Sequence, residues 1–223
     1  MIKIESLYKS YGSTKNSTTV LHNINLQIHK DTLTILQGVS GSGKSTLLSL
    51  IAGFEKPCSG AIYIDDQPIS KLPDLHQSRL RNTKIGFIFQ HFNLFDELSV
   101  YENVMTPLVV QNLPSKNLHN QVTAALQKAN ISHKKDEIAR NLSGGEKQRC
   151  AIARALANDA DLIICDEPTA NLDAANTQHF LQTLKELRNS KKTIIVATHD
   201  PIFKSLDGVD RVIKMENGKI CGA

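Results

Sequence analysis

Residues 38–45, Gly-Val-Ser-Gly-Ser-Gly-Lys-Ser, constrain this chain of 223 residues more than any other stretch. They fit the pattern G-x-x-x-x-G-K-[S/T], a loop whose backbone N–H groups surround phosphate oxygens. An apolar, β-branched run at 32–37 precedes the loop and a helical run at 45–52 follows it, which is the context that this motif requires. A glycine-rich turn with a chance lysine does not explain these flanks. The stretch therefore predicts a binding site for a nucleoside triphosphate.

The residue types in the loop predict how each one contacts the nucleotide. Glycines let the backbone approach the phosphates, and the following helix directs its free N–H groups at the same anion. We expect Lys44 to reach the β- and γ-phosphates, the Ser45 hydroxyl to ligate Mg²⁺, and Thr46 to donate to the α-phosphate. The predicted nucleotide-binding residues of the loop are Gly38, Ser40, Gly41, Ser42, Gly43, Lys44, Ser45 and Thr46.

Composition narrows the class of protein. The net charge is +4 and the basic residues are scattered, so nucleic acid is not an expected partner. The four cysteines lack C-x-x-C spacing, which favours reduced thiols over a zinc site. The N-terminus lacks the apolar core of a signal peptide, and no run approaches the about 18 apolar residues that span a bilayer. We expect a cytoplasmic chain that reaches a membrane only through a partner.

Apolar periodicity predicts an α/β chain. Ile2 and Ile4 alternate with polar residues, which indicates an edge strand, and residues 20–28 alternate again. An antiparallel β-layer is therefore expected before the phosphate loop. Two apolar strands, at 161–165 and 193–198, are separated by a helical pattern and form a predicted βαβ unit with parallel strands.

The middle of the chain differs from its flanks. Helical patterns from residue 91 to 158 interrupt the alternation of strands and helices. We expect residues 91–158 to form an inserted helical lobe, with residues 1–90 and 159–223 forming the catalytic lobe and its β-layer. The apolar loop at 92–98 has two interpretations, an exposed docking surface or part of the core of the helical lobe, and the residues alone leave both open.

Asp166 and Glu167 directly follow the apolar strand at 161–165. In an open parallel sheet, the carboxyl ends of the strands face the ligand crevice. A carboxylate at this position can hold Mg²⁺, and a second acid beside it can polarise the attacking water. We assign Asp166 to the metal and Glu167 to the water. The alternative is an ordinary acidic turn at the end of the strand, and the presence of the phosphate loop in the same chain disfavours it.

Ser143, Gly144, Gly145 and Glu146 form a second glycine-rich site. The spacing S-x-x-E ahead of a helical run predicts a capping box. This arrangement presents a helix N-terminus, with a backbone free to approach an anion. Taken alone, the four residues are explained equally well by a capped helix with no ligand.

The order of these motifs resembles that of the ATP-binding cassette (ABC) ATPases. The chain carries the phosphate loop, a glutamine after a strand, L-S-G-G-E, an apolar strand with Asp-Glu, Asn-Leu-Asp, and a histidine after a strand. The resemblance covers essentially the whole chain, and L-S-G-G-E is its most diagnostic element. It implies an α/β fold with a P-loop NTPase (RecA-like) core, an N-terminal antiparallel β-layer and an inserted α-helical lobe. It also implies ATPase activity with ATP and Mg²⁺.

The resemblance implies roles for residues outside the loop. Tyr11 looks like the aromatic residue that stacks on adenine, although an aromatic covering apolar surface is the alternative. Gln90 resembles the glutamine that senses Mg²⁺ and water and links the two lobes. His199 resembles the switch histidine that contacts the γ-phosphate and positions water. The implied catalytic residues are Lys44, Glu167 and His199, and the implied magnesium ligands are Ser45, Gln90 and Asp166.

The resemblance also implies a head-to-tail homodimer. Ser143, Gly144, Gly145 and Glu146 would cap the γ-phosphate of ATP held by the other copy, and residues 170–173 would cross the dimer interface. Each ATP would then lie between Lys44 of one copy and Ser143 of the other.

Residues 86–94 and 102–108 resemble the ATPases of lipoprotein release (LolD type) and macrolide efflux (MacB type). This likeness implies a separate integral membrane permease that docks near residues 90–101, and a place on the inner face of the cell membrane. The alternative is a division or envelope-signalling ATPase (FtsE type) that moves no substrate. A soluble ABC protein acting on DNA or ribosomes is disfavoured, because the chain has one cassette and no heptad insertion. Residues 13–19 stand where such cassettes carry a short variable insertion.

Overall fold

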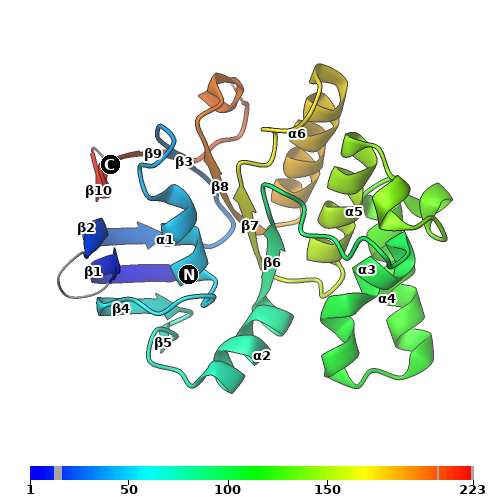
Figure 1. Cartoon of the computed structure of the whole chain (residues 1–223), viewed down its shortest axis with the longest axis horizontal. Coiled ribbons are helices and arrows are strands. Elements are labelled where there is room, and N and C mark those ends of the chain that lie inside the picture. The colour runs from blue at the N-terminus through cyan, green and yellow to red at the C-terminus, as the bar shows by residue number, and fades with distance from the viewer. Residues whose placement is uncertain (13–16, 205, 222–223) are drawn as a thin grey trace.

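The computed structural model describes residues 1–12, 17–204 and 206–221, so most of the variable stretch at 13–19 lies outside the described residues. One sheet is antiparallel, as expected, with the strand order β2-β1-β4-β5 (Figure 1). Its strands are β1 (Ile2–Tyr11), β2 (Thr18–Ile28), β4 (Ser59–Ile64) and β5 (Gln67–Pro68).

The predicted position of β1 at an edge is wrong. Ile2 pairs with Ile28 of β2 on one side and with Ile64 of β4 on the other. Alternation reports which face of a strand is buried, and that face is the same for a central and an edge strand. The position of β1 depends on β4, which returns to it after the phosphate loop and the helix that follows.

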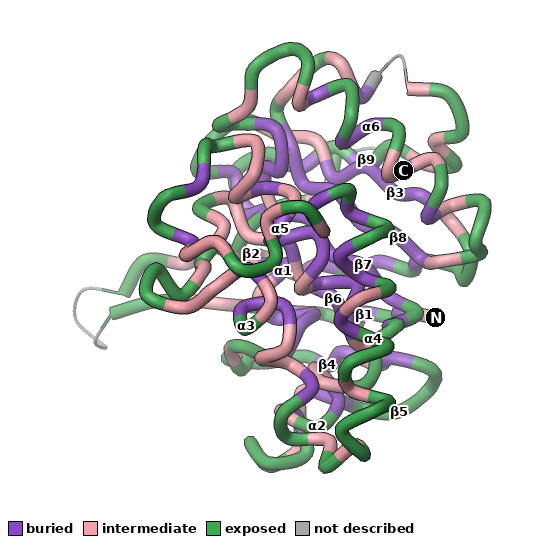
Figure 2. The backbone as a smooth tube through the Cα atoms, turned by 90° about the vertical axis from the view of Figure 1, so that its right-hand side faces the viewer, coloured by how far each residue is buried: buried purple, intermediate pink, exposed green. Residues whose placement is uncertain are grey.

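The second sheet has the order β10-β9-β3-β8-β7-β6. Strands β9 and β10 pair antiparallel, and all other pairs are parallel, which confirms the predicted βαβ topology. Every residue of β8 is buried, and Figure 2 shows β7 and β8 within the buried interior. The strands are β3 (Leu33–Gln37), β6 (Ile85–Ile88), β7 (Leu162–Asp166), β8 (Thr193–Thr198), β9 (Arg211–Glu216) and β10 (Lys219–Ile220).

The main helices are α1 (Lys44–Ile51), α2 (Asp74–Lys84), α3 (Val100–Met105), α4 (Ser115–Lys128), α5 (Gly144–Leu156) and α6 (Ala174–Asn189). Helix α1 is part of a hydrophobic core that residues of both sheets share. Helices α3, α4 and α5 gather on the opposite side of the molecule (Figure 1). The proposed lobe boundaries at residues 91 and 158 stay a prediction.

Helix α5 packs closely against strand β6 of the parallel sheet. A Cβ on Gly86 of β6 would lie 2.1 Å from the carbonyl oxygen of Ala155 in α5, so only glycine allows this approach. None of the helices in the described ranges has both the length and the apolar character needed to cross a bilayer.

Candidate functional site

Three neighbouring strands carry the predicted catalytic residues at their carboxyl ends. Strand β3 runs into the phosphate loop, β7 ends at Asp166, and β8, which lies between them, ends at Thr198. Because parallel strands end at the same edge of the sheet, Lys44, Glu167 and His199 meet there although they are far apart in sequence.

Glu167 is the centre of this cluster. Its Oε1 lies 3.2 Å from Lys44 Nζ, and its Oε2 accepts a hydrogen bond from the His199 backbone N–H at 3.3 Å and lies 3.0 Å from His199 Nδ1. The Lys44 and Glu167 side chains are only 4% and 9% exposed, so neither charge is left to bulk water. Glu167 has a φ of 44°, an uncommon conformation, and its N–H bonds to the Ala197 carbonyl at 2.9 Å.

The phosphate loop has the geometry that an anion-binding loop needs. Gly41 and Gly43 have φ values of 79° and 99°, and open space lies beside Gly41. Lys44 Nζ donates to the Gly38 carbonyl at 2.8 Å. No described side chain caps the N-terminus of α1, and Ser42 Oγ is buried without a hydrogen-bond partner among the described atoms. These unused donors fit a polyphosphate.

Two of the three predicted magnesium ligands, Ser45 and Asp166, lie side by side. Ser45 Oγ donates to Asp166 Oδ1 at 2.9 Å. Burial raises the pKa of Asp166, and the nearby Glu167 charge adds to the rise, whereas the Ser45 hydrogen bond and the Lys44 charge oppose it. A hydroxyl and a carboxylate oxygen side by side suit Mg²⁺, which prefers oxygen ligands. Within the described ranges, the Gln90 side chain makes no hydrogen bond to either residue; its backbone carbonyl accepts one from Asn171 Nδ2 at 3.0 Å.

Tyr11 lies at the end of β1 and is 41% exposed. Its hydroxyl donates to Glu55 Oε2 at 2.6 Å, and Lys9 Nζ lies 4.8 Å from the ring centre. Burial raises the pKa of Tyr11, the Glu55 carboxylate raises it further, and Thr46 of the phosphate loop acts in the opposite direction. The Tyr11 side chain therefore lies near Thr46 and remains partly exposed.

The predicted capping box of the second glycine site is confirmed. Ser143 Oγ accepts a hydrogen bond from the Glu146 N–H at 3.4 Å, while the Ser143 N–H donates to Glu146 Oε2 at 2.8 Å. In the described part of the chain, no hydrogen bond or ion pair connects residues 143–146 to the phosphate loop. A single copy therefore does not join its two glycine-rich sites.

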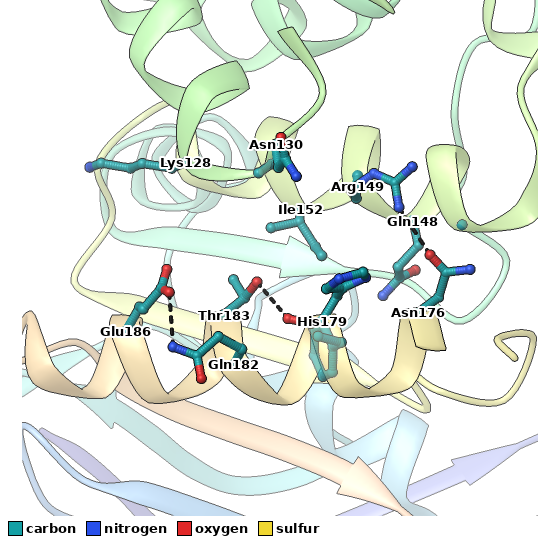
Figure 3. Close-up of a pocket in the computed structure, with 13 residues that line it drawn as sticks. Lys128, Asn130, Gln148, Arg149, Ile152, Asn176, His179, Gln182, Thr183 and Glu186 are labelled. Carbon is teal, nitrogen blue, oxygen red and sulfur yellow. Dashed lines mark hydrogen bonds between the residues drawn. The ribbon is translucent and has the colours of Figure 1, made fainter. Parts of the chain in front are cut away.

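A hydrogen bond connects the N-terminal ends of α5 and α6, and the sequence did not predict this contact. Arg149 Nη1 donates to Asn176 Oδ1 at 2.9 Å, at one end of a cavity of about 200 Å³ between the two helices (Figure 3). The Asn176 N–H in turn bonds to Asp173, the N-cap of α6. A Cβ on Gly145 would lie 2.3 Å from Asn176 Oδ1, which explains a glycine here. The contact fixes the second glycine site against residues 170–173.

Sequence reasoning also missed Arg154. Phe92 and Asn93, just after Gln90, have φ values of 60° and 49°. From α5, Arg154 Nη2 donates to the Phe92 carbonyl at 2.5 Å and its Nη1 donates to the Asn93 carbonyl. Burial lowers the pKa of the Arg154 guanidinium. No sequence signal marks this contact, because an arginine in an amphipathic helix usually faces water.

The model of the ABC transporter family matches residues 21–170 of the sequence. The chain belongs to the ABC transporter family. It is 36% identical to the lipoprotein-releasing system ATP-binding protein LolD of Saccharophagus degradans, over 98% of this chain and 95% of that protein. It is 39% identical to the methionine import ATP-binding protein MetN of Mannheimia succiniciproducens over 99% of its own length, but it spans only 64% of that protein.

Solved structures of ABC cassettes are also similar to this chain. The dimeric structure of MJ0796, a bacterial ABC transporter cassette, has a TM-score of 0.91 and 35% identity, over 99% of this chain and 96% of that one. A dimer of MJ0796 in a post-hydrolysis state, bound to ADP and Pi, matches equally well. The predicted fold class and the prediction of an ABC ATPase domain are confirmed, with ATP as the nucleotide and Mg²⁺ as its usual partner in this family. The LolD type is one of several relatives, because MetN also matches.

Proposed function

We propose that this ABC ATPase hydrolyses ATP as a homodimer and drives a separate membrane permease of the lipoprotein-release and macrolide-efflux superfamily. The observation that carries the catalytic part is the cluster of Lys44, Glu167 and His199 at one edge of the parallel sheet. The similarity to LolD, which extends over 95% of that protein, supports the superfamily. A place on the inner face of the cell membrane follows from this assignment.

The three residues of the cluster would have different roles in hydrolysis. Lys44 exchanges its contacts with Glu167 and the Gly38 carbonyl for phosphate oxygens when ATP binds. The Glu167 carboxylate then loses its ion pair and is available to polarise water. His199, already within 3.0 Å of Glu167, holds that carboxylate and the water in place. Ser45 and Asp166 would hold Mg²⁺, which neutralises charge on the phosphates.

The homodimer explains the distance between the two glycine-rich sites. In one copy the second glycine site lies on α5, on the far side of the molecule from α1 (Figure 1). A partner copy in head-to-tail orientation would bring its Ser143 to the ATP bound at Lys44. The dimeric state of the similar cassette MJ0796 supports this arrangement.

A mixing experiment tests the shared site. Lys44→Ala and Ser143→Ala should each be inactive alone. Mixed in equal amounts, they should recover about a quarter of wild-type turnover, because half of the dimers are mixed and each has one intact site. Wild-type turnover by monomeric Ser143→Ala protein would overturn the proposal.

An exposed aromatic groove supports the docking of a permease near residues 90–101. The groove has a volume of about 300 Å³ and is lined by Phe54, Phe87, Phe95, Pro107, Arg81 and Arg154, among others. Phe95 is 56% exposed and Phe54 45% exposed, which favours docking over core packing for this part of the loop. Arg81 and Arg154 add positive charge to the lining of the groove, which suits the carbonyl end of a cytoplasmic helix of the permease.

The docking surface is tested by Phe95→Asp. We expect loss of binding to the permease and of transport, with basal ATP hydrolysis within about twofold of wild type, because Phe95 is outside the catalytic cluster. Val110→Asp is the matched control, since Val110 is 63% exposed and does not line the groove. Unfolding of the Phe95 variant would favour the core-packing interpretation instead.

A methionine-import cassette is the second candidate, because MetN relatives reach 39–40% identity. A division or envelope-signalling ATPase remains a further alternative. Purification with the native membrane partner separates the three. A partner bound to a periplasmic cell-wall hydrolase would indicate signalling, and an importer with an external methionine-binding protein would indicate uptake.

A further inference from the structure

Lys134 lies next to the second glycine site. It belongs to the short 3-10 helix Ser132–Lys134, and its Nζ is 3.5 Å from Glu146 Oε1. The other carboxylate oxygen, Oε2, accepts hydrogen bonds from the Ser143 N–H and the Ser143 hydroxyl, both at 2.8 Å. The hydrogen bonds from Ser143 lower the pKa of Glu146, and the charge of Lys134 lowers it further. Glu146 is therefore negatively charged at neutral pH.

This charge conflicts with the role proposed for the site. In the homodimer, the γ-phosphate of the partner's ATP would approach the N-terminus of α5, where Glu146 occupies the first turn. The dipole of a helix supplies about half a positive charge at its N-terminus, less than the charge of one carboxylate. Glutamine would complete the same capping box without a charge. The site therefore needs a cation to remain attractive to a phosphate.

The hydrogen bonds add a second reason. The single proton of the Ser143 hydroxyl points to Glu146 Oε2. When this hydroxyl donates to a phosphate instead, Glu146 loses one of its donors and keeps the Ser143 N–H and Lys134. Among the described residues, the neighbouring Lys135 makes no ion pair with Glu146; its ammonium group lies 3.9 Å from Asp136.

We propose that Lys134 is a positioning residue that neutralises Glu146 and so allows the second glycine site to accept the γ-phosphate of ATP bound to another copy of this chain. The proposal rests on the head-to-tail homodimer of the proposed function. It assigns to a residue outside L-S-G-G-E a share in the affinity between two ATP-loaded copies.

The test is the ATP concentration that gives half-maximal dimerisation, measured by analytical ultracentrifugation in a Glu167→Gln background that slows hydrolysis. Lys134→Gln should raise this concentration roughly fivefold, the upper range for a partly exposed ion pair. Lys135→Gln removes the same charge one residue away and should change it less than about twofold. In protein with Glu167 intact, Lys134→Gln should raise KM for ATP and leave kcat at saturating ATP unchanged.

Rescue separates this role from a structural one. Glu146→Gln removes the charge that Lys134 compensates, so adding Lys134→Gln to it should change dimerisation less than about twofold. An equal loss in both backgrounds, or no loss from Lys134→Gln alone, would overturn the inference. Ser143→Ala tests the proposed function separately: if it dimerises with unaltered ATP dependence, the shared site is wrong. If Ser143→Ala abolishes dimerisation while Lys134→Gln behaves like Lys135→Gln, only the role of Lys134 is refuted.

Discussion

The two glycine-rich sites satisfy their polar groups in different ways. At the phosphate loop, Lys44 pairs with Glu167, which follows strand β7 more than a hundred positions later, and Ser42 Oγ is left without a partner among the described atoms. At the second site, Ser143 and Glu146 satisfy one another within a single helical turn. The first site is assembled by the sheet and the second within one helical turn, and each must exchange contacts to take up a phosphate, Lys44 at the first and the Ser143 hydroxyl at the second.

The largest effect should come from Glu167→Gln. Glutamine keeps the size of the side chain but removes the charge that we propose polarises water, so turnover should fall by about a hundredfold or more. ATP binding should persist, and ATP-bound dimers should accumulate. Phosphate release and equilibrium dialysis measure the two properties separately. Normal turnover would show that another residue is the base.

Lys44→Ala should weaken ATP binding by about tenfold to a hundredfold, because a charge-assisted contact to phosphate is lost. It should also lower the melting temperature of the nucleotide-free protein, since Glu167 is left buried without its ion pair. Adding Glu167→Gln should restore the melting temperature but not the binding. If the double variant stays as unstable as Lys44→Ala, the ion pair does not stabilise this edge of the sheet.

Ser143→Ala should affect the second site alone. Removal of the N-cap hydroxyl should cost about 1 kcal/mol of folding free energy, as in other capped helices. ATP binding to the isolated monomer should stay within about twofold of wild type, because no described bond joins this site to the phosphate loop in one copy. Calorimetry on dilute protein measures the affinity. A large loss of monomer affinity would show that the two sites are coupled within one chain.

The smallest effect on activity should come from Asp210→Asn. Asp210 bonds to β3, the strand that leads into the phosphate loop, but lies outside the catalytic cluster. Hydrogen bonds from Arg188 and from the Leu33 N–H lower the pKa of Asp210, although burial opposes them. Because the folded-state pKa is below that of the unfolded chain, about 3.9, this stabilisation is present above that value and is lost as pH falls through the lower one. We expect about 0.5 kcal/mol at pH 7, since the pair is partly exposed.

Urea unfolding at pH 7 and at successively lower pH measures the difference between wild type and Asp210→Asn. That difference should shrink below about pH 4, where wild-type Asp210 begins to be protonated in the unfolded state. Turnover at pH 7 should stay within about twofold of wild type. A difference that grows on acidification would contradict the direction of the pKa shift.

The contrast between the sites also explains what the sequence could predict. Local rules sufficed for the capping box at Ser143 and for the strand that ends in Asp166. Periodicity did not give the order of the strands, which brings Lys44, Glu167 and His199 together in the structure. The role of His199 came from the family resemblance. Arg154 and Lys134 could not be predicted, because each acts through a contact between segments that no spacing rule connects. The central position of β1 was missed for the same reason.

Arg154 connects the aromatic groove to the backbone that follows Gln90. One guanidinium lines the aromatic groove and also bonds to two backbone carbonyls just after Gln90. If a permease helix binds in this groove, as we propose, its contact with Arg154 would act on the backbone carbonyls of Phe92 and Asn93 and not on their side chains.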